Sequence, residues 1–199
     1  MIGGIVLAAG ASRRFGGPKQ LAPLGGRPLL DHAVAAQCGV PAIERVVVVL
    51  GARAGEVRRE VDLHGAEPVV CEGWAEGQAA SLRAGLADMA GAEAVIVTLG
   101  DQPGVTPRVI AMVVDCVDAP EPAARAVYHG RPGHPVLLKR ELFPRLRELR
   151  GDVGALPVLA RAGVKEVEAG ALCDPADVDR PEDLVAAARR MDDGRRPAS

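Results

Sequence analysis

Residues 45–50, Arg-Val-Val-Val-Val-Leu, constrain the fold of this chain more than any other stretch. A continuous β-branched run of this kind is typical of a strand that is covered on both faces, and such strands occur in parallel sheets. Two further apolar runs stand at residues 5–7 and 94–99. We therefore expect a largely parallel sheet whose strands are connected by helices.

The segments between these runs supply the expected helices and the remaining strands. Alternation of strand and helix up to residue 117 predicts right-handed crossovers, and hence a Rossmann-like three-layer α/β sandwich with a mostly parallel mixed sheet. Helical patterns are found at residues 29–38, 54–63, 79–90, 106–117, 140–150 and 154–162 and from Pro181 onward, and further strand patterns at residues 67–71, 126–128, 135–138 and 164–167.

The length of the chain sets its domain organisation. The 199 residues, 48% of them apolar, suffice for one well-buried domain. The sequence contains no internal repeat and no long linker. We expect a single domain over residues 1–191 and a disordered tail over residues 192–199.

Composition argues against several classes of partner. The formal net charge is −2, and the aromatic residues are one Trp, one Tyr and two Phe. A net charge of −2 gives no overall basic surface for nucleic acid or a membrane, and recognition of nucleic acid by base stacking needs more aromatic side chains. Neither is therefore expected as a partner. The four cysteines show no zinc-type spacing, and no basic leader precedes the first strand. We expect buried, reduced thiols in a cytoplasmic protein.

The loop that follows residues 5–7 carries the clearest functional pattern. It contains Gly10, Ser12 and Gly16 together with the cations Arg13, Arg14 and Lys19. Small residues let backbone N–H groups approach phosphate oxygens, and the cations supply positive charge, so the pattern favours a polyphosphate cradle. The two arginines are adjacent, so only one is expected to face phosphate. The alternative is an ordinary strand-to-loop crossing with solvated arginines.

Acidic residues after two predicted strands favour a divalent cation. Asp101 directly follows the strand at residues 94–99, and Asp179 is its expected partner, with Asp177 as a weaker candidate. Mg²⁺ takes one or two protein carboxylates and fills its other positions with water and substrate phosphates. The alternatives are a helix cap or turn for Asp101 and a helix start for the two later aspartates.

The loops at residues 8–19, 72–78 and 100–103 all follow predicted strands. Ligands of such folds bind at the carboxyl ends of the strands, so these loops are expected to face one crevice. His134, in a Gly-His-Pro turn, is a candidate for binding a second substrate there. The alternative for a lone histidine in a tight turn is a structural role.

With these residues assembled, the chain resembles the MobA-like nucleotidyltransferases, and most closely their molybdenum cofactor cytidylyltransferase branch. Residues 7–21 are similar to the nucleotide-binding signature L-A-A-G-x-S-x-R-x-G-x-x-K, which is a specific motif. Shorter matches follow in order: residues 73–86 to the base-contacting segment, 100–103 to G-D-x-P, 130–135 to G-x-x-G-H-P, and 177–183 to D-x-D-T-P-E-D with Arg180 in place of threonine.

The resemblance implies a Mg²⁺-dependent cytidylyltransferase of the nucleotide-diphospho-sugar transferase type. It implies transfer of CMP from CTP to the phosphate of molybdopterin, with release of pyrophosphate and a molybdoenzyme as a further partner. Ala8 and Ala9 favour CTP, since a glycine pair accompanies GTP in this family. The implied roles are catalysis by Lys19, Asp101 and Arg14; nucleotide binding by Leu7, Ala8, Ala9, Gly10, Ser12, Arg13, Gly16, Gln78 and Ser81; Mg²⁺ binding by Asp101 and Asp179; and acceptor binding by His134 and Asp152.

One departure from the family pattern bears on the acceptor. After residues 151–155 the related sequences commonly carry arginine, and this chain has Leu156. A different small phosphorylated acceptor is therefore an alternative. A non-catalytic cofactor-binding relative is another, although its expected mark is loss of Lys19 or Asp101, and both residues are present. A dinucleotide-dependent oxidoreductase is disfavoured, because the first loop lacks G-x-G-x-x-G and no acidic residue ends the strand at residues 45–50.

Overall fold

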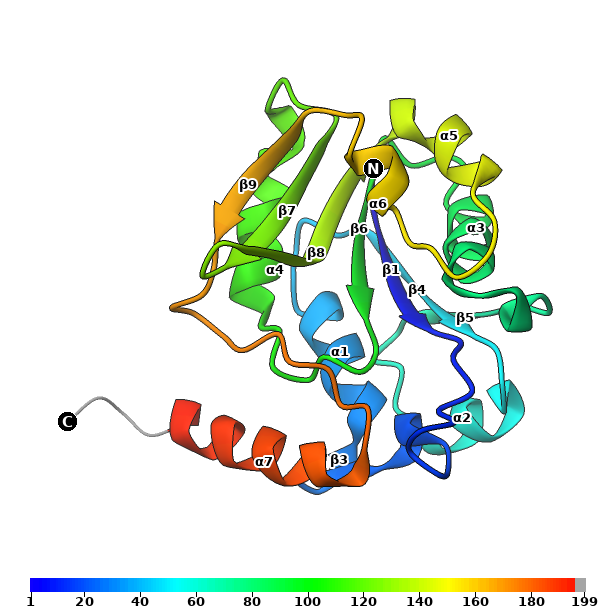
Figure 1. Ribbon diagram of the computed structural model, residues 1–199, viewed down its shortest axis with the longest axis vertical. Helices are drawn as coiled ribbons and strands as arrows, with labels where there is room; N and C mark the ends of the chain where they lie inside the picture. Colours follow the sequence, from blue (N-terminus) through cyan, green and yellow to red (C-terminus); the bar gives the residue numbers. More distant parts are fainter. Residues whose placement is uncertain (196–199) are drawn as a thin grey trace.

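A computed structural model of the protein describes residues 1–195, with side chains described through residue 190. Within these residues a seven-stranded sheet has the order β5-β4-β1-β6-β8-β7-β9, and only β8 runs antiparallel to its neighbours (Figure 1). The mostly parallel mixed sheet expected from the sequence is confirmed. Its strands are β1 (Ile2–Ala8), β4 (Arg45–Leu50), β5 (Glu67–Val70), β6 (Ala94–Leu99), β7 (Ala123–Tyr128), β8 (Arg131–Lys139) and β9 (Val164–Glu168).

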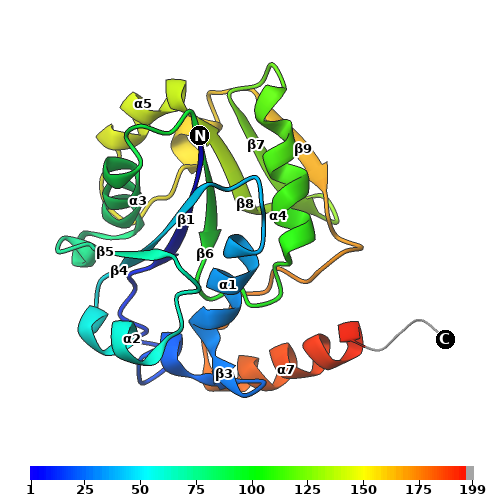
Figure 2. The ribbon, with the colours of Figure 1, turned by 180° about the vertical axis from the view of Figure 1, so that it is seen from behind.

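Helices cover both faces of the sheet, which gives the expected three layers. In Figure 2, seen from behind, α1 and α4 lie in front of the sheet, whereas α3 and α5 belong to the other face. The helices are α1 (Leu29–Cys38), α2 (Ala54–Glu60), α3 (Gln78–Asp88), α4 (Pro107–Val114), α5 (Phe143–Glu148), α6 (Leu156–Leu159) and α7 (Pro181–Arg195), and a small hairpin joins β2 (Pro23–Leu24) to β3 (Arg27–Pro28). Single 3-10 turns span Lys19–Leu21, Trp74–Glu76, Asp115–Asp118 and Arg140–Leu142.

Strand β1 is the centre of the parallel part of the sheet. It pairs with β4 on one side and with β6 on the other, so that Ile5 stands between Val47 and Val97. Because successive side chains of a strand point to opposite faces, Ile5 packs beneath α3 while Val6 packs beneath α1. Both are fully buried, which explains why these strands are apolar without alternation.

The hairpin of β7 and β8 differs from the sequence-based expectation. The segment at residues 130–134 was expected to be a loop, but β8 already begins at Arg131 and contains His134. The turn is made by His129 and Gly130, both with positive φ, at 51° and 77°. Arg131 and Pro132 pair with β7 and not with β6, which pairs only with residues 136–139, and the β7 ladder is irregular between these two parts of β8. Prolines and glycine are tolerated in a stretch that is bonded on one side only.

Other elements differ in their ends. The helices expected at residues 140–150 and 154–162 are shorter, at Phe143–Glu148 and Leu156–Leu159. Helix α7 continues through residue 195, so it includes the first half of the tail expected to be disordered; residues 196–199 lie outside the described residues. All four cysteines are free, but only Cys71 is buried, whereas the other three are half-buried. No helix within residues 1–195 combines the length and apolar character required to cross a bilayer.

Glycine at position 85 allows α3 to pack closely on β1. A Cβ at this position would lie 2.7 Å from Cγ2 of the buried Ile5. We expect Gly85→Ala to lower the free energy of unfolding by about 1–3 kcal/mol through overpacking. The matched control is Gly55→Ala in α2, where a Cβ meets nothing within 4 Å. This control is expected to raise the free energy of unfolding by roughly 0.5–1 kcal/mol, since alanine favours a helix over glycine. Urea unfolding of both variants measures the difference, and equal stabilities would contradict the close-packing argument.

Candidate active site

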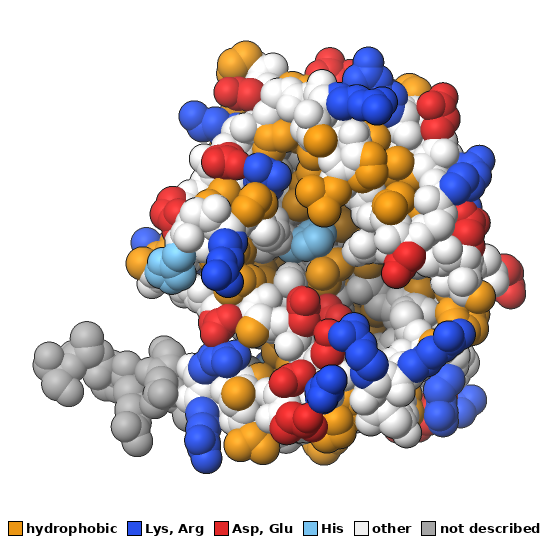
Figure 3. All heavy atoms as spheres, in the orientation of Figure 1, with side chains coloured by type: hydrophobic (Ala, Val, Ile, Leu, Met, Phe, Trp, Pro, Cys, Tyr) orange, Lys and Arg blue, Asp and Glu red, His pale blue; other side chains and the backbone are white. Residues whose placement is uncertain are grey.

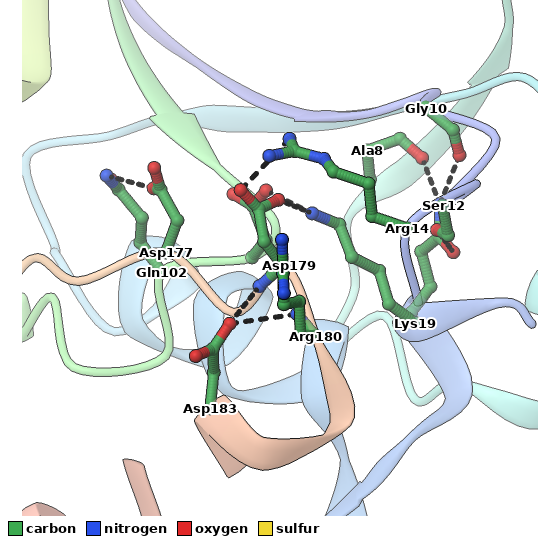
Figure 4. A network of polar contacts seen from close by, with 12 residues as sticks. Ala8, Gly10, Ser12, Arg14, Lys19, Gln102, Asp177, Asp179, Arg180 and Asp183 are labelled. Carbon is green, nitrogen blue, oxygen red and sulfur yellow. Dashed lines mark hydrogen bonds and ion pairs between the residues drawn. The ribbon is translucent and has the colours of Figure 1, made fainter. Parts of the chain in front are cut away.

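Four charged side chains from three distant segments meet at the carboxyl end of β1 and β6. Lys19 Nζ lies 2.6 Å from Asp101 Oδ2 and 3.1 Å from Asp179 Oδ1. Arg14 Nη2 lies 3.0 Å from Asp179 Oδ2 (Figure 4). The side chains of Lys19 and Asp101 are only 14% and 23% exposed. The three residues named as catalytic candidates from the sequence, Lys19, Asp101 and Arg14, are therefore together with Asp179 in one cluster.

Gln20 shapes the loop that delivers Lys19. Its Nε2 donates to the backbone oxygens of Ala8 and Gly10, both at 3.0 Å, and its Oε1 accepts from Ser12 Oγ at 3.2 Å. Gln20 is 5% exposed and is not among the site residues predicted from the sequence. A sequence signal for this role exists. Backbone carbonyls just after a strand lose their ladder partners, so a nearby side chain with N–H donors is expected to bond them. Ser12 itself has a left-handed backbone, with φ at 54°.

A segment before α7 delivers Asp179. The backbone N–H of Val178 donates to Asp101 O at 2.9 Å, which ties this segment to the end of β6. Asp183 accepts from the backbone N–H groups of Asp179 and Arg180, at 2.9 and 2.8 Å. These two bonds lower the pKa of Asp183, and they hold the backbone of Asp179 in place at the start of the helix. The D-x-D-x-P-E-D stretch is thus both a helix start and a source of a site carboxylate.

The cluster concentrates opposite charges. Burial opposes the charge on Lys19, but Asp101 and Asp179 outweigh it and raise the pKa of the ammonium. Asp177 lies nearby and accepts from Gln102 Nε2 at 2.8 Å. Burial and the negative charge of Asp101 raise the pKa of Asp177. The excess of carboxylates over cations around Lys19 makes this point attractive to a further cation.

The donor set suits a hard divalent cation that shares its shell with phosphates. Asp101 and Asp179 each direct one carboxylate oxygen at the ammonium of Lys19, so the two carboxylates lie close together. Among the described residues, no three His, Cys, Asp or Glu side chains form a group arranged to hold a metal ion. Mg²⁺ usually binds through one or two carboxylates plus substrate phosphates and water, so a pair of aspartates fits it.

A mostly apolar cavity of about 150 Å³ opens beside the charged cluster. In Figure 3 this face is hollowed at its middle, with hydrophobic side chains above the hollow and acidic and basic ones below it. Gln78, Arg125 and His134 are the polar or charged residues among those that line the cavity. Its apolar walls come from Leu7, Leu82, Val97, Val136, Leu138, Ala155, Leu156 and Leu159.

His134 reaches the cavity from the start of the antiparallel strand β8. Val136 pairs with Val97, so His134 lies level with the carboxyl end of β6 and faces the same edge as Asp101. Loss of water around the ring lowers the pKa of His134 to about 4, against a weaker opposing effect of Asp101. The imidazole is therefore neutral near pH 7, and it offers the cavity one donor and one acceptor.

The remaining predicted residues lie on the first loop, at the start of α3 and beside the cavity. Leu7 is half-buried and lines the cavity, Ala8 and Ala9 are buried, and Gly10, Arg13 and Gly16 are exposed along the first loop. Gln78 and Ser81 stand in the first turn of α3. Asp152 accepts the backbone N–H of Gln78 at 3.2 Å, so its carboxylate caps α3. Leu156, where arginine is common, is 67% exposed at the rim of the cavity.

Two relatives show the chemical range of similar proteins. The chain is 34% identical over 161 residues to a nicotine blue oxidoreductase of Paenarthrobacter nicotinovorans, a match covering 76% of this chain and 78% of that protein. It is 38% identical over 125 residues to a 2-C-methyl-D-erythritol 4-phosphate cytidylyltransferase of Ralstonia nicotianae, covering 58% of this chain and 49% of that one.

Solved structures match almost the whole chain. A homologue of Mycobacterium tuberculosis Rv0371c from Mycobacterium sp. strain JC1 is 35% identical, with a TM-score of 0.83 and coverage of 96% and 98% of the two chains. Rv0371c of M. tuberculosis, solved in complex with manganese, is 32% identical, with a TM-score of 0.74 and coverage of 94% and 97%. The structural neighbours include nucleotidyltransferases of the nucleotide-diphospho-sugar transferase fold, which confirms the expected fold type.

The resemblance to the MobA-like nucleotidyltransferases is borne out by a family match over most of the chain. The MobA-like NTP transferase domain matches residues 4–167, a span that includes the first loop, Asp101, His134 and Asp152. This protein therefore belongs to the MobA-like NTP transferase family.

Proposed function

We propose that this protein transfers CMP from CTP to the phosphate of molybdopterin and releases pyrophosphate. The observation that carries the proposal is the meeting of Lys19 and Arg14 with Asp101 and Asp179 at the carboxyl edge of the sheet. Cations there suit a triphosphate, and paired carboxylates suit the divalent cation that accompanies it. The cavity beside them gives room for a second substrate.

The chain's own residues act by orientation and charge. The small residues of the first loop let backbone N–H groups approach the phosphates, and Gln20 holds that loop in shape. Lys19 and Arg14 place positive charge where the α-phosphate accumulates negative charge as the acceptor phosphate attacks it. Because that attacking phosphate is already anionic, no general base is required of the protein.

Asp101 and Asp179 are the residues that would hold the divalent cation. We propose Mg²⁺, and the complex of the similar Rv0371c with manganese supports a divalent cation in general. Such an ion neutralises phosphate charge and favours departure of pyrophosphate. The ammonium of Lys19 contacts both carboxylates. It would therefore lie close to the cation and to the phosphates that the cation binds.

The choice of CTP rests on the start of the first loop and on a relative. Ala8 and Ala9 are both buried, and an alanine pair accompanies CTP in the family that the signature resembles. The similar Ralstonia protein is a cytidylyltransferase. Gln78 and Ser81, at the start of α3, are proposed to contact the nucleotide.

The acceptor is proposed to lie in the cavity, where the neutral His134 supplies a hydrogen bond. Mostly apolar walls with a few polar side chains suit a ring system such as a pterin. Leu156 leaves a second candidate, a different small phosphorylated acceptor, because sequences of the molybdopterin-linked branch commonly carry an arginine at this point of the rim. We retain a cytoplasmic location and a molybdoenzyme recipient as parts of the molybdopterin proposal.

An oxidoreductase activity, suggested by the name of the Paenarthrobacter relative, is the contrasting candidate. The loop after β1 has no G-x-G-x-x-G, and Gly51 rather than an acidic residue follows β4. Failure to bind immobilised NAD is the expected result, and retention on NAD would support this candidate instead.

Incubation with each of four labelled NTPs tests the proposed function. With Mg²⁺ and molybdopterin, CTP is expected to yield a CMP adduct and pyrophosphate, whereas CTP without acceptor is expected to persist. A product formed only with another phosphorylated acceptor would show that molybdopterin is not the acceptor, while the type of reaction would stand. Absence of any nucleotidyl product with every acceptor would overturn the proposal.

Asp101→Ala is expected to reduce turnover to below about one hundredth, because removal of this carboxylate leaves Asp179 alone to hold the cation. Mn²⁺ binding, followed by electron paramagnetic resonance in the presence of CTP, should weaken in parallel. Circular dichroism should show an intact fold, since Asp101 lies on a turn beyond β6. The matched control is Asp118→Ala, which alters an exposed aspartate in the 3-10 turn Asp115–Asp118 and should keep full turnover. Retained activity of Asp101→Ala at saturating Mg²⁺ would count against the metal role.

Lys19→Ala should lower kcat by about 10²-fold and change the Kd of CTP much less, because its contact strengthens as charge develops on the α-phosphate. Steady-state kinetics give kcat, and quenching of Trp74, the single tryptophan of the chain, gives the Kd. The control is Lys165→Ala, an exposed lysine on β9. Equal losses in kcat and in CTP affinity would identify Lys19 as a binding residue only.

A further inference from the structure

A loop on the acceptor side of the site is fastened to the segment that begins α3. We call residues 149–155 the acceptor-side loop; it leads directly into the cavity wall at Ala155 and Leu156. The backbone N–H of Ala79 donates to Gly151 O at 3.2 Å, and that of Gln78 donates to Asp152 Oδ1 at 3.2 Å. The N-cap of α3, Gly77, has no side chain, so Asp152 supplies the cap from a distant part of the chain.

Arg83 adds a second attachment one turn further along α3. Its Nη1 donates to Leu149 O at 2.6 Å and to Glu76 Oε1 at 3.0 Å, while its Nη2 bonds Glu76 Oε2 at 2.7 Å. Glu76 Oε1 also accepts the backbone N–H of Gly151, at 3.4 Å. The paired bonds to Arg83 lower the pKa of Glu76. One guanidinium and one carboxylate thus connect the start of α3 with both ends of a turn in the acceptor-side loop.

The two segments approach so closely that one position accepts only glycine. Gly77 has φ at 122°, and a Cβ there would lie 2.6 Å from Cα of Asp152. Across the same contact, a Cβ at Gly154 would lie 2.9 Å from Gln78 Oε1. The close contact therefore extends from Gly77 to the residues that line the cavity, and it does not depend on side chains alone.

These contacts join two parts of the site that bind different substrates in the proposed reaction. Gln78 and Ser81 are the residues of α3 proposed to contact the nucleotide, and Gln78 also lines the cavity, together with Gly154, Ala155 and Leu156 of the acceptor side. Arg83 neither lines the cavity nor joins the charged cluster around Lys19, and its side chain is 23% exposed. Its contacts are with Glu76 and with the backbone of the acceptor-side loop.

We propose that Arg83 is a positioning residue that, with Glu76 and Asp152, fixes the wall of the acceptor cavity to the nucleotide-binding start of α3. Nucleotide that orders this start then orders the acceptor-side loop as well, so CTP prepares the cavity for the acceptor. The same coupling operates in reverse, because the effect of one ligand on another is reciprocal. This inference rests on the proposed function for the identity of the two substrates.

Hydrogen exchange tests the attachment without any reaction. In the protein without ligands, Arg83→Leu is expected to speed exchange of the amides at residues 149–155 by about tenfold, since a bidentate charged contact of roughly 1.4 kcal/mol or more is lost. Arg83→Lys keeps the charge but loses the fork, and should give an intermediate rate. The matched control is Arg45→Leu, which breaks a similar paired contact with Glu67 and a contact with Asp88 at the far end of α3, away from the acceptor-side loop. Unchanged exchange in Arg83→Leu would overturn the proposal.

Ligand dependence tests the coupling. CTP with Mg²⁺ should slow exchange at residues 149–155 in the natural protein and in Arg45→Leu, and much less in Arg83→Leu. In kinetics, Arg83→Leu should raise KM for the acceptor by about tenfold and alter the Kd of CTP, read from Trp74 fluorescence, less than about twofold. A loss shared equally by both substrates, or one confined to CTP, would overturn the coupling.

Failure of the proposed function would look different. The natural protein would then give no Trp74 response to CTP, while the ligand-free exchange rates would still report whether Arg83 holds the loop. If Arg83→Leu does not fold, Arg83→Lys and Glu76→Gln provide the same measurements, because each weakens the paired contact while keeping a side chain of similar size.

Discussion

The ammonium of Lys19, shared by two carboxylates, is the interaction on which this site depends. Lys19, Asp101 and Asp179 are far apart in sequence, and each arrives on a different connection at the carboxyl edge of the sheet. Burial of a lysine alone would lower its pKa, but the two carboxylates reverse that effect. A cation and two anions held this close in a partly dry site are strongly coupled. A change to any one of them therefore alters the charge that the other two present to a ligand.

The parallel part of the sheet creates this meeting point. Strands β1 and β6 run side by side in the same direction, so the loops that follow them leave from one edge. Strand β8 runs antiparallel to β6, so its first residues lie at this same edge. His134 therefore enters the site from within a strand, where the pattern of residues favours a loop. Apolar strands without alternation, buried on both faces, give this edge a rigid base, as functional groups that must keep their geometry require.

Several features of the fold were predictable from the sequence because local signals were strong. The runs at residues 45–50 and 94–99 form strands with the predicted limits, and α1 spans the predicted residues 29–38. The start of β8 differs from the predicted loop, since proline and glycine weaken a strand pattern even where one side of the strand needs no partner. Arg83 and the capping role of Asp152 were not predictable, because each depends on a partner brought close only by the tertiary fold.

The position of α3 explains how a site assembled from separate loops acts as one unit. Its first turn carries the residues proposed for the nucleotide, its N-terminus is capped by Asp152 from the acceptor-side loop, and Arg83 returns to that same loop one turn later. Its middle is fixed to the sheet through Gly85, where contact with Ile5 leaves no room for a side chain. A displacement of the helix start thus cannot be absorbed by sliding along β1, and it must instead be transmitted to the wall of the cavity. Specificity for the acceptor is therefore expected to depend on residues that never touch it.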